Sequence, residues 1–82
     1  MANKGQVDGS WDRAKPVRGR NADAWRRDEE DNLIRRGSYG TEGEYGWEID
    51  HRNPVSKGGT DNPRNLRALH WEENREKGDK TD

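Results

Sequence analysis

The chain has 82 residues, no cysteine and a formal net charge of -1, and 40% of its residues are charged against 24% that are hydrophobic. A chain of this length forms one small domain, and the lack of cysteine excludes disulfides and zinc sites built on thiolates. No segment is apolar and long enough to span a membrane and no signal-peptide pattern follows Met1, so we expect a soluble, cytoplasmic protein with no membrane partner.

The hydrophobic residues are few, and the high charge content leans toward disorder. Four tryptophans and two tyrosines argue against a wholly disordered chain. A domain this small buries little apolar surface, so its core must depend on large aromatic side chains. We expect that core to contain Trp25, Trp47, Trp71, Leu33, Ile34, Ile49, Val55, Leu66 and Leu69.

The first 44 residues show little regular patterning. Residues 1–10 are small and polar, which predicts a flexible tail. Residues 11–44 are expected to form an irregular arm, because Pro16 and Gly19 interrupt any long element and residues 37–46 contain four glycines. Within the arm, the polar run at residues 28–32 predicts the turn of a short hairpin.

From residue 45 onward the pattern is more regular. Tyr45, Trp47 and Ile49 alternate with polar residues, which predicts a half-buried strand over residues 45–50. Residues 52–63 are rich in Asn, Pro and Gly and predict a structured loop. A second strand over residues 65–69 and a helix over residues 70–78 follow, with His70 as a cap or packing residue. The order strand, loop, strand, helix predicts a β-hairpin closed by a short helix.

Four polar residues fall where this unit would bring them together. Asp50 and His51 end the first strand, Asn65 begins the second, and Asn74 lies on the helix. Asp50 and Asn74 offer oxygen ligands for a hard divalent cation, and His51 beside them could deprotonate a water molecule. Asn65 could bond the backbone across the loop, or bond the second ring nitrogen of His51 and so fix its tautomer.

Each of these residues also has a simpler interpretation. An adjacent acid and histidine at a strand end is more often a surface pair, and Asn74 alone would be an ordinary exposed helix residue. Glu48 could orient a ligand, bind an arginine or be solvated. Residues 41–82 hold seven Lys and Arg against ten Asp and Glu, an excess of acid that a bound cation would offset. Only the combination of four residues points to a site.

The stretch WEIDHRNPVSKGGTDNPRNLRALHWEENREKGDK resembles the HNH endonuclease motif, also called the ββα-metal or His-Me finger fold. The resemblance rests on the acid-His pair, the Pro and Gly-Gly loop, the Asn-Leu pair and the Asn on a short helix ending in Lys-Gly. It implies an α+β fold with a β-hairpin and a short C-terminal helix around one divalent ion over residues 45–80, preceded by an irregular N-terminal arm. RAKP, WRRD and IRR-SYG resemble the lead-in of small bacterial and phage members.

The resemblance also implies roles. Asp50 and Asn74 would hold the metal, His51 would be the general base, and Asn65 would order the loop and the histidine. Metal-dependent hydrolysis of DNA phosphodiester bonds would leave 5′-phosphate and 3′-hydroxyl ends, with Mg²⁺ or Mn²⁺ favoured over Ni²⁺ or Zn²⁺. Five basic residues that flank the proposed cleft, each a solvated charge by default, are expected to contact DNA phosphates: Lys57, Arg64, Arg67, Arg75 and Lys77.

The chain departs from many relatives in one respect. They often brace the fold with a zinc ion held by two Cys-x-x-Cys pairs, whereas here His70 and Glu73 occupy the places of the second pair. Packing of Trp47 and Trp71 is expected to take over that role. Two alternatives stay open: a catalytically weak nucleic-acid-binding module or subunit of a larger phage or restriction complex, and a nuclease toxin with an immunity-type inhibitor.

Overall fold

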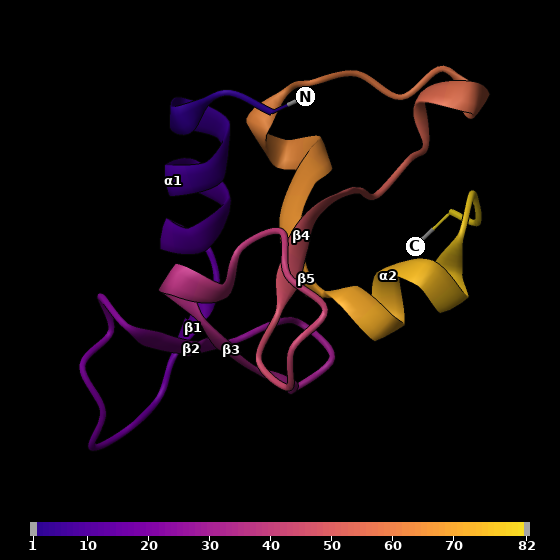
Figure 1. Ribbon diagram of the computed structural model, residues 1–82. Coiled ribbons are helices and arrows are strands. Elements are labelled where there is room, and N and C mark those ends of the chain that lie inside the picture. Colours follow the sequence, from indigo (N-terminus) through magenta and orange to yellow (C-terminus); the bar gives the residue numbers. More distant parts are fainter. Residues whose placement is uncertain (1, 82) are drawn as a thin grey trace.

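The structure is a computed structural model that describes residues 2–81. Both sheets are antiparallel; one has the strand order β1-β2-β3 and the other pairs β4 with β5. In Figure 1 the β4–β5 hairpin lies between the two helices, and the three-stranded sheet lies at its lower end. The elements in chain order are α1 (Lys4–Asp12), β1 (Lys15–Pro16), β2 (Trp25–Arg27), β3 (Leu33–Arg35), β4 (Trp47–His51), β5 (Leu66–His70) and α2 (Trp71–Lys77).

The C-terminal half forms the predicted hairpin and helix. The β4–β5 register pairs Asp50 with Arg67 and His51 with Leu66. His70 caps α2, because its Nδ1 accepts a hydrogen bond of 3.2 Å from the backbone N–H of Glu72, as the cap interpretation predicted. The α+β architecture with a β-hairpin and a C-terminal helix is therefore confirmed.

The N-terminus differs from the predicted tail, because residues 4–12 form helix α1. Asn3 and Gln6 make a reciprocal capping box: the side chain of Asn3 accepts from the Gln6 N–H at 2.8 Å, and that of Gln6 accepts from the Asn3 N–H at 3.0 Å. Val7 and Trp11, four residues apart, are buried on one face of the helix. The stripe is short and the helix contains two glycines, so the segment lacks a strong helical pattern in sequence.

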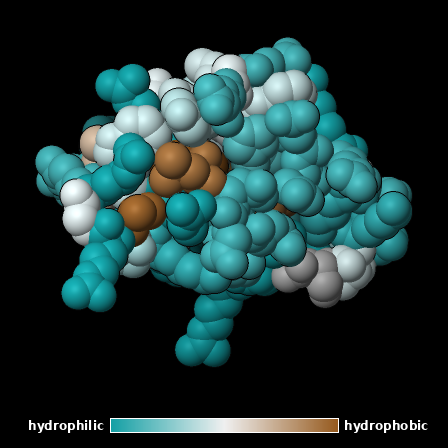
Figure 2. All heavy atoms as spheres, turned by 90° about the horizontal axis from the view of Figure 1, so that it is seen from below, coloured by the Kyte–Doolittle hydropathy of each residue, from teal (hydrophilic) through white to brown (hydrophobic). Residues whose placement is uncertain are grey.

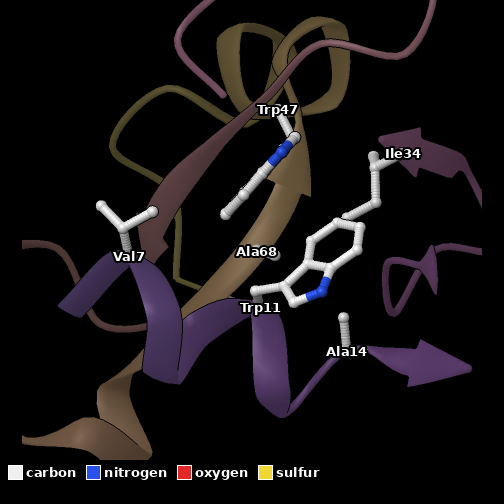
Figure 3. Close-up of a cluster of buried hydrophobic side chains, with 6 residues drawn as sticks. All are labelled: Val7, Trp11, Ala14, Ile34, Trp47 and Ala68. Carbon is white, nitrogen blue, oxygen red and sulfur yellow. The ribbon is translucent and has the colours of Figure 1, made fainter. Parts of the chain in front are cut away.

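The hydrophobic core lies between α1 and the β4–β5 hairpin (Figure 3). Trp47 is fully buried, with its ring centroid 5.4 Å from that of Trp11 and 5.0 Å from that of Tyr39. The indole N–H of Trp47 donates to the carbonyl oxygen of Arg35 at 2.9 Å, which satisfies its one polar atom. The core cluster consists of Val7, Trp11, Ala14, Ile34, Trp47 and Ala68.

The predicted core was partly wrong. Ile34, Trp47, Leu66 and Leu69 are buried, but Val55 is 63% exposed. Four other predicted core residues are only half-buried. Trp11, which was not predicted to lie in the core, packs against Trp47 instead. The reason is helix α1, which supplies a packing surface that the prediction of a tail left out. The half-buried residues are Trp25, Leu33, Ile49 and Trp71.

In the arm, β2 and β3 pair as an antiparallel hairpin across a turn at residues 28–32. Asp28 in this turn is fully buried. Its carboxylate accepts hydrogen bonds from the N–H groups of Glu30 at 3.0 Å and Asn32 at 2.8 Å, and from the distant N–H of His70 at 2.8 Å. One buried carboxylate therefore joins the arm to the junction of β5 and α2.

Hydrophilic side chains dominate the face of the molecule seen in Figure 2, where hydrophobic atoms gather in one small area. Neither helix within residues 2–81 has the length and apolar character required to cross a membrane.

Candidate active site

Three of the four predicted site residues line one pocket at the end of β4. Asp50 and His51 are the last two residues of β4, and Asn74 faces them from the middle of α2. All three line a pocket of about 300 Å³. His51 and Asn74 also line a larger pocket of about 620 Å³ that reaches the start of α1 and includes Glu48. The structure therefore brings the acid, the histidine and the helix amide together, with His51 between two cavities.

The carboxylate of Asp50 is buried and paired with two cations. Its Oδ2 accepts from Nε of Arg67 at 2.8 Å and its Oδ1 accepts from Nζ of Lys77 at 3.1 Å. Lys77 also donates to the backbone carbonyl of His51 at 3.0 Å. Because the register places Arg67 directly opposite Asp50, this ion pair is a cross-strand pair inside the hairpin. The negative charge of Asp50 is compensated on both of its oxygens.

The donor set suits a hard divalent cation. Asp50 contributes a carboxylate, and Asn74, whose Nδ2 donates to Oε1 of Glu48 at 2.9 Å, contributes its amide oxygen. Within residues 2–81 no group of three or more His, Cys, Asp or Glu side chains is placed to hold a metal. A metal ion held by these two side chains alone would have two protein oxygens from two elements, with water or substrate completing its shell, an arrangement that Mg²⁺ accepts.

Asn65 organises the loop between the two strands. Its Oδ1 accepts from the N–H of Asn53 at 2.8 Å, and its Nδ2 donates to the carbonyl oxygens of Asn53 at 3.0 Å and Thr60 at 2.7 Å. Of the two arrangements expected for Asn65, the structure has the one that bonds the backbone across the loop. The side chain thus holds both ends of the loop together.

The glycine pair in this loop has two separate causes. Gly58 has a φ of 87°, in the left-handed region that favours glycine. At Gly59 a Cβ atom would collide with the backbone carbonyl of Asn53 and crowd that of Pro54. A side chain at Gly59 would therefore block this path of the loop, and one at Gly58 would strain its backbone.

His51 contacts Asp61, a residue of the loop over residues 52–63. Its Nε2 lies 2.8 Å from Oδ1 of Asp61, and 30% of the histidine side chain is exposed. Asp61 directly follows Thr60, whose carbonyl is held by Asn65. No periodicity marks Asp61 in the sequence, because its approach to His51 depends on how the whole loop folds back.

The five predicted phosphate contacts occupy different environments. Arg67 and Lys77 are largely buried around Asp50, with 6% and 11% of their side chains exposed. Arg75 is exposed, pairs with Glu42 at 3.1 Å and lies over the ring of Trp71. Lys57 and Arg64 are exposed on the loop. Only three of the five therefore present an open charged surface.

Two further arginines gather near Arg64. Arg13 and Arg52 join Arg64 and Arg67 around a pocket of about 250 Å³ between α1 and β5. Glu29 lies among them, and its hydrogen bond from Arg52 holds the pKa of its carboxyl below the ordinary value. Arg13 and Arg52 were not predicted to take part in binding, because α1 and the hairpin turn bring this pocket together.

A small pocket joins the His51 cavity to this arginine pocket along α1. It shares Gln6, Asp61 and Leu66 with the cavity beside His51, and it shares Arg13 and Pro63 with the arginine pocket. Helix α1 forms one wall of all three. The helix therefore lines three neighbouring hollows that lie between His51 and the arginines.

Comparison with protein families found a match to an endonuclease family. The family model described as HNH endonuclease matches residues 37–80, which is more than half of the chain and includes all four predicted site residues. Searches of the curated proteins and of the solved structures found no match.

Proposed function

The chain belongs to the HNH endonuclease family, and on that premise we propose that it is a metal-dependent endonuclease that hydrolyses DNA phosphodiester bonds. Nuclease activity is general in this family. The observation that carries the finer proposal is the pocket at the end of β4, which is lined by Asp50, His51 and Asn74 together. A base and two hard oxygen donors on one cavity match the needs of phosphodiester hydrolysis.

In this proposal His51 is the general base. A neutral imidazole accepts a proton near physiological pH, so it can take one from the water that attacks the phosphorus atom. Asp50 and Asn74 would hold Mg²⁺ or Mn²⁺, and a bound divalent cation would supply Lewis-acid stabilisation of charge on the phosphate and on the leaving 3′ oxygen. Asn65 acts indirectly, because it keeps the loop folded against the end of β4. The products would be 5′-phosphate and 3′-hydroxyl ends.

We further propose that the DNA backbone follows the hollows along α1. Phosphate groups would contact Arg13 and Arg64 at the arginine pocket, with Lys57 and Arg75 as outer contacts. Such contacts release counterions, so DNA affinity should fall steeply as salt rises. The net charge of -1 means that this basic surface is local and that the rest of the chain adds no general attraction.

A second candidate function is supported by the ion pairs around Asp50. Both oxygens of Asp50 have cationic partners, and the amide nitrogen of Asn74 is bound to Glu48. With these contacts in place, the domain would bind nucleic acid without useful catalysis, alone or within a larger phage or restriction complex. Control by an immunity-type inhibitor stays a prediction.

Cleavage of supercoiled plasmid separates the two functions. Wild type, His51→Ala and Asp23→Ala would be incubated with Mg²⁺, Mn²⁺, Ni²⁺, Zn²⁺ or EDTA, and DNA binding would be measured in parallel by gel shift. Asp23 is an exposed acid in the arm and serves as the control. The endonuclease proposal expects metal-dependent nicking that His51→Ala abolishes without loss of DNA binding. Binding with no cleavage by folded wild type under any metal would instead support the second candidate.

A further inference from the structure

We propose that Asp61 is a positioning residue for the general base, fixing the orientation and tautomer of His51. This inference rests on the proposed function of His51. The observation is the contact between His51 Nε2 and Asp61 Oδ1, which at 2.8 Å is a short hydrogen bond. Asp61 is not one of the four polar residues of the motif that includes His51.

The chemistry of the two groups decides which nitrogen carries the proton. An ionised carboxylate can only accept hydrogen bonds, so Nε2 of His51 must be the donor. In the neutral imidazole the other nitrogen, Nδ1, then holds the free lone pair. Asp61 thereby makes Nδ1 the atom that takes the proton from water. A carboxylate in this position also stabilises the imidazolium that forms when the proton arrives.

The loop holds Asp61 in place from both sides. On one side, the carbonyl of Thr60 accepts from Asn65 Nδ2 at 2.7 Å. On the other, the carbonyl of Asn62 accepts from the Asn65 N–H at 2.7 Å, and the Asn62 side chain accepts from the Arg64 N–H at 3.0 Å. Asn65 therefore orders the histidine through Asp61 rather than by touching it.

The contribution of Asp61 is one of geometry rather than stability. Its side chain is 68% exposed, and pairs this exposed contribute little to folding. Removing it should leave the fold intact. Simple electrostatics predicts a different change, because the loss of an acid beside the DNA path would reduce repulsion of phosphate, raise the apparent affinity for DNA and so lower KM. Whether kcat falls or KM falls therefore separates the two accounts.

The kinetic test compares Asp61→Ala with Asp61→Asn, which retains an acceptor oxygen of the same reach. Asp61→Ala should lower kcat for plasmid nicking by about 10- to 100-fold with little change in KM, and Asp61→Asn should recover most of that loss. Asp23→Ala controls for the loss of one negative charge, and circular dichroism checks the fold. An unchanged or raised kcat in Asp61→Ala would overturn the proposal.

An independent test reads the imidazole directly in the metal-free protein. Nitrogen-15 spectra of His51, recorded at alkaline pH, should show a hydrogen-bonded Nε2 proton in wild type and in Asp61→Asn. In Asp61→Ala that proton should exchange rapidly with solvent. Identical imidazole spectra in wild type and Asp61→Ala would refute the role of Asp61. Because this readout needs no cleavage, it decides the role of Asp61 even if wild type proves inactive and the proposed function fails.

Discussion

Replacing Asp28 with alanine should cost more stability than any other single change in the arm. The carboxylate is fully buried and accepts from three backbone N–H groups, those of Glu30, Asn32 and His70. Two of these bonds close the β2–β3 turn. The third crosses 42 positions of sequence to the junction of β5 and α2, and so holds the arm against the helix that carries Asn74.

The magnitude follows from what the alanine leaves behind. The N–H of His70 is buried, and a buried donor without an acceptor costs about 1–3 kcal/mol. Losing the two turn bonds adds about 1 kcal/mol each, so the sum is about 3–5 kcal/mol. A chain of this length has a total stability of about 4–12 kcal/mol. Asp28→Ala should therefore lose about a quarter or more of the total free energy of unfolding.

Urea denaturation followed by tryptophan fluorescence would measure the loss. Asp28→Asn keeps the shape and one acceptor oxygen and should fall between wild type and alanine, and Asp23→Ala should match wild type. If Asp28→Ala lost less than about 1 kcal/mol, the buried carboxylate would not be what joins the arm to the ββα unit, and the reasoning would fail.

Three further predictions concern the loop, the metal and pH. Asn65→Ala removes three hydrogen bonds across the loop, so limited proteolysis should cut residues 53–61 much faster than in wild type, and equal rates would count against it. Lys77→Met removes the cation 3.1 Å from Asp50, so Mn²⁺ binding measured by calorimetry should tighten by roughly several-fold or more, whereas unchanged affinity would show that lysine and metal do not compete. Because Arg52 lowers the pKa of Glu29 below 4.5, the folded state binds that proton less readily than the unfolded state. The stabilisation by the ionised Glu29 is complete above the unfolded-state pKa and is lost as pH falls through the folded-state pKa. When pH is lowered from neutral to about pH 3, the free energy of unfolding should therefore fall less for Glu29→Gln than for wild type. Equal losses in the two proteins would contradict this.

Without cysteine, the fold is held together by aromatic packing and hydrogen bonds instead of a zinc ion bound by thiolates. Packing of Trp47 and Trp71 was expected to replace the zinc brace of many relatives. Trp47 is buried in the core, but its main aromatic partners are Trp11 and Tyr39, and Trp71 is only half-buried. His70 bonds the carbonyl of Glu44 through Nε2 at 2.7 Å. Aromatic packing is joined here by hydrogen bonds, with the Asp28 carboxylate as the longest-range link.

The hairpin and helix of the ββα unit could be predicted from the sequence because their signals are local. The alternation of Tyr45, Trp47 and Ile49 and the stop at Gly78 depend on neighbours a few residues apart. The convergence of Asp50, His51 and Asn74 on one pocket then follows from that short unit.

What only the tertiary structure decided is which side chains meet across long separations. Helix α1 is stabilised by burial of Val7 and Trp11 against the hairpin, and its short stripe is too weak to predict by itself. No sequence pattern distinguishes Arg67 from the exposed arginines, but its position opposite Asp50 in the β4–β5 register buries it. The approach of Asp61 to His51 likewise requires the loop to be folded and held by its hydrogen bonds. Such contacts depend on elements far apart in the chain facing one another, and that information is carried by packing and not by any local pattern.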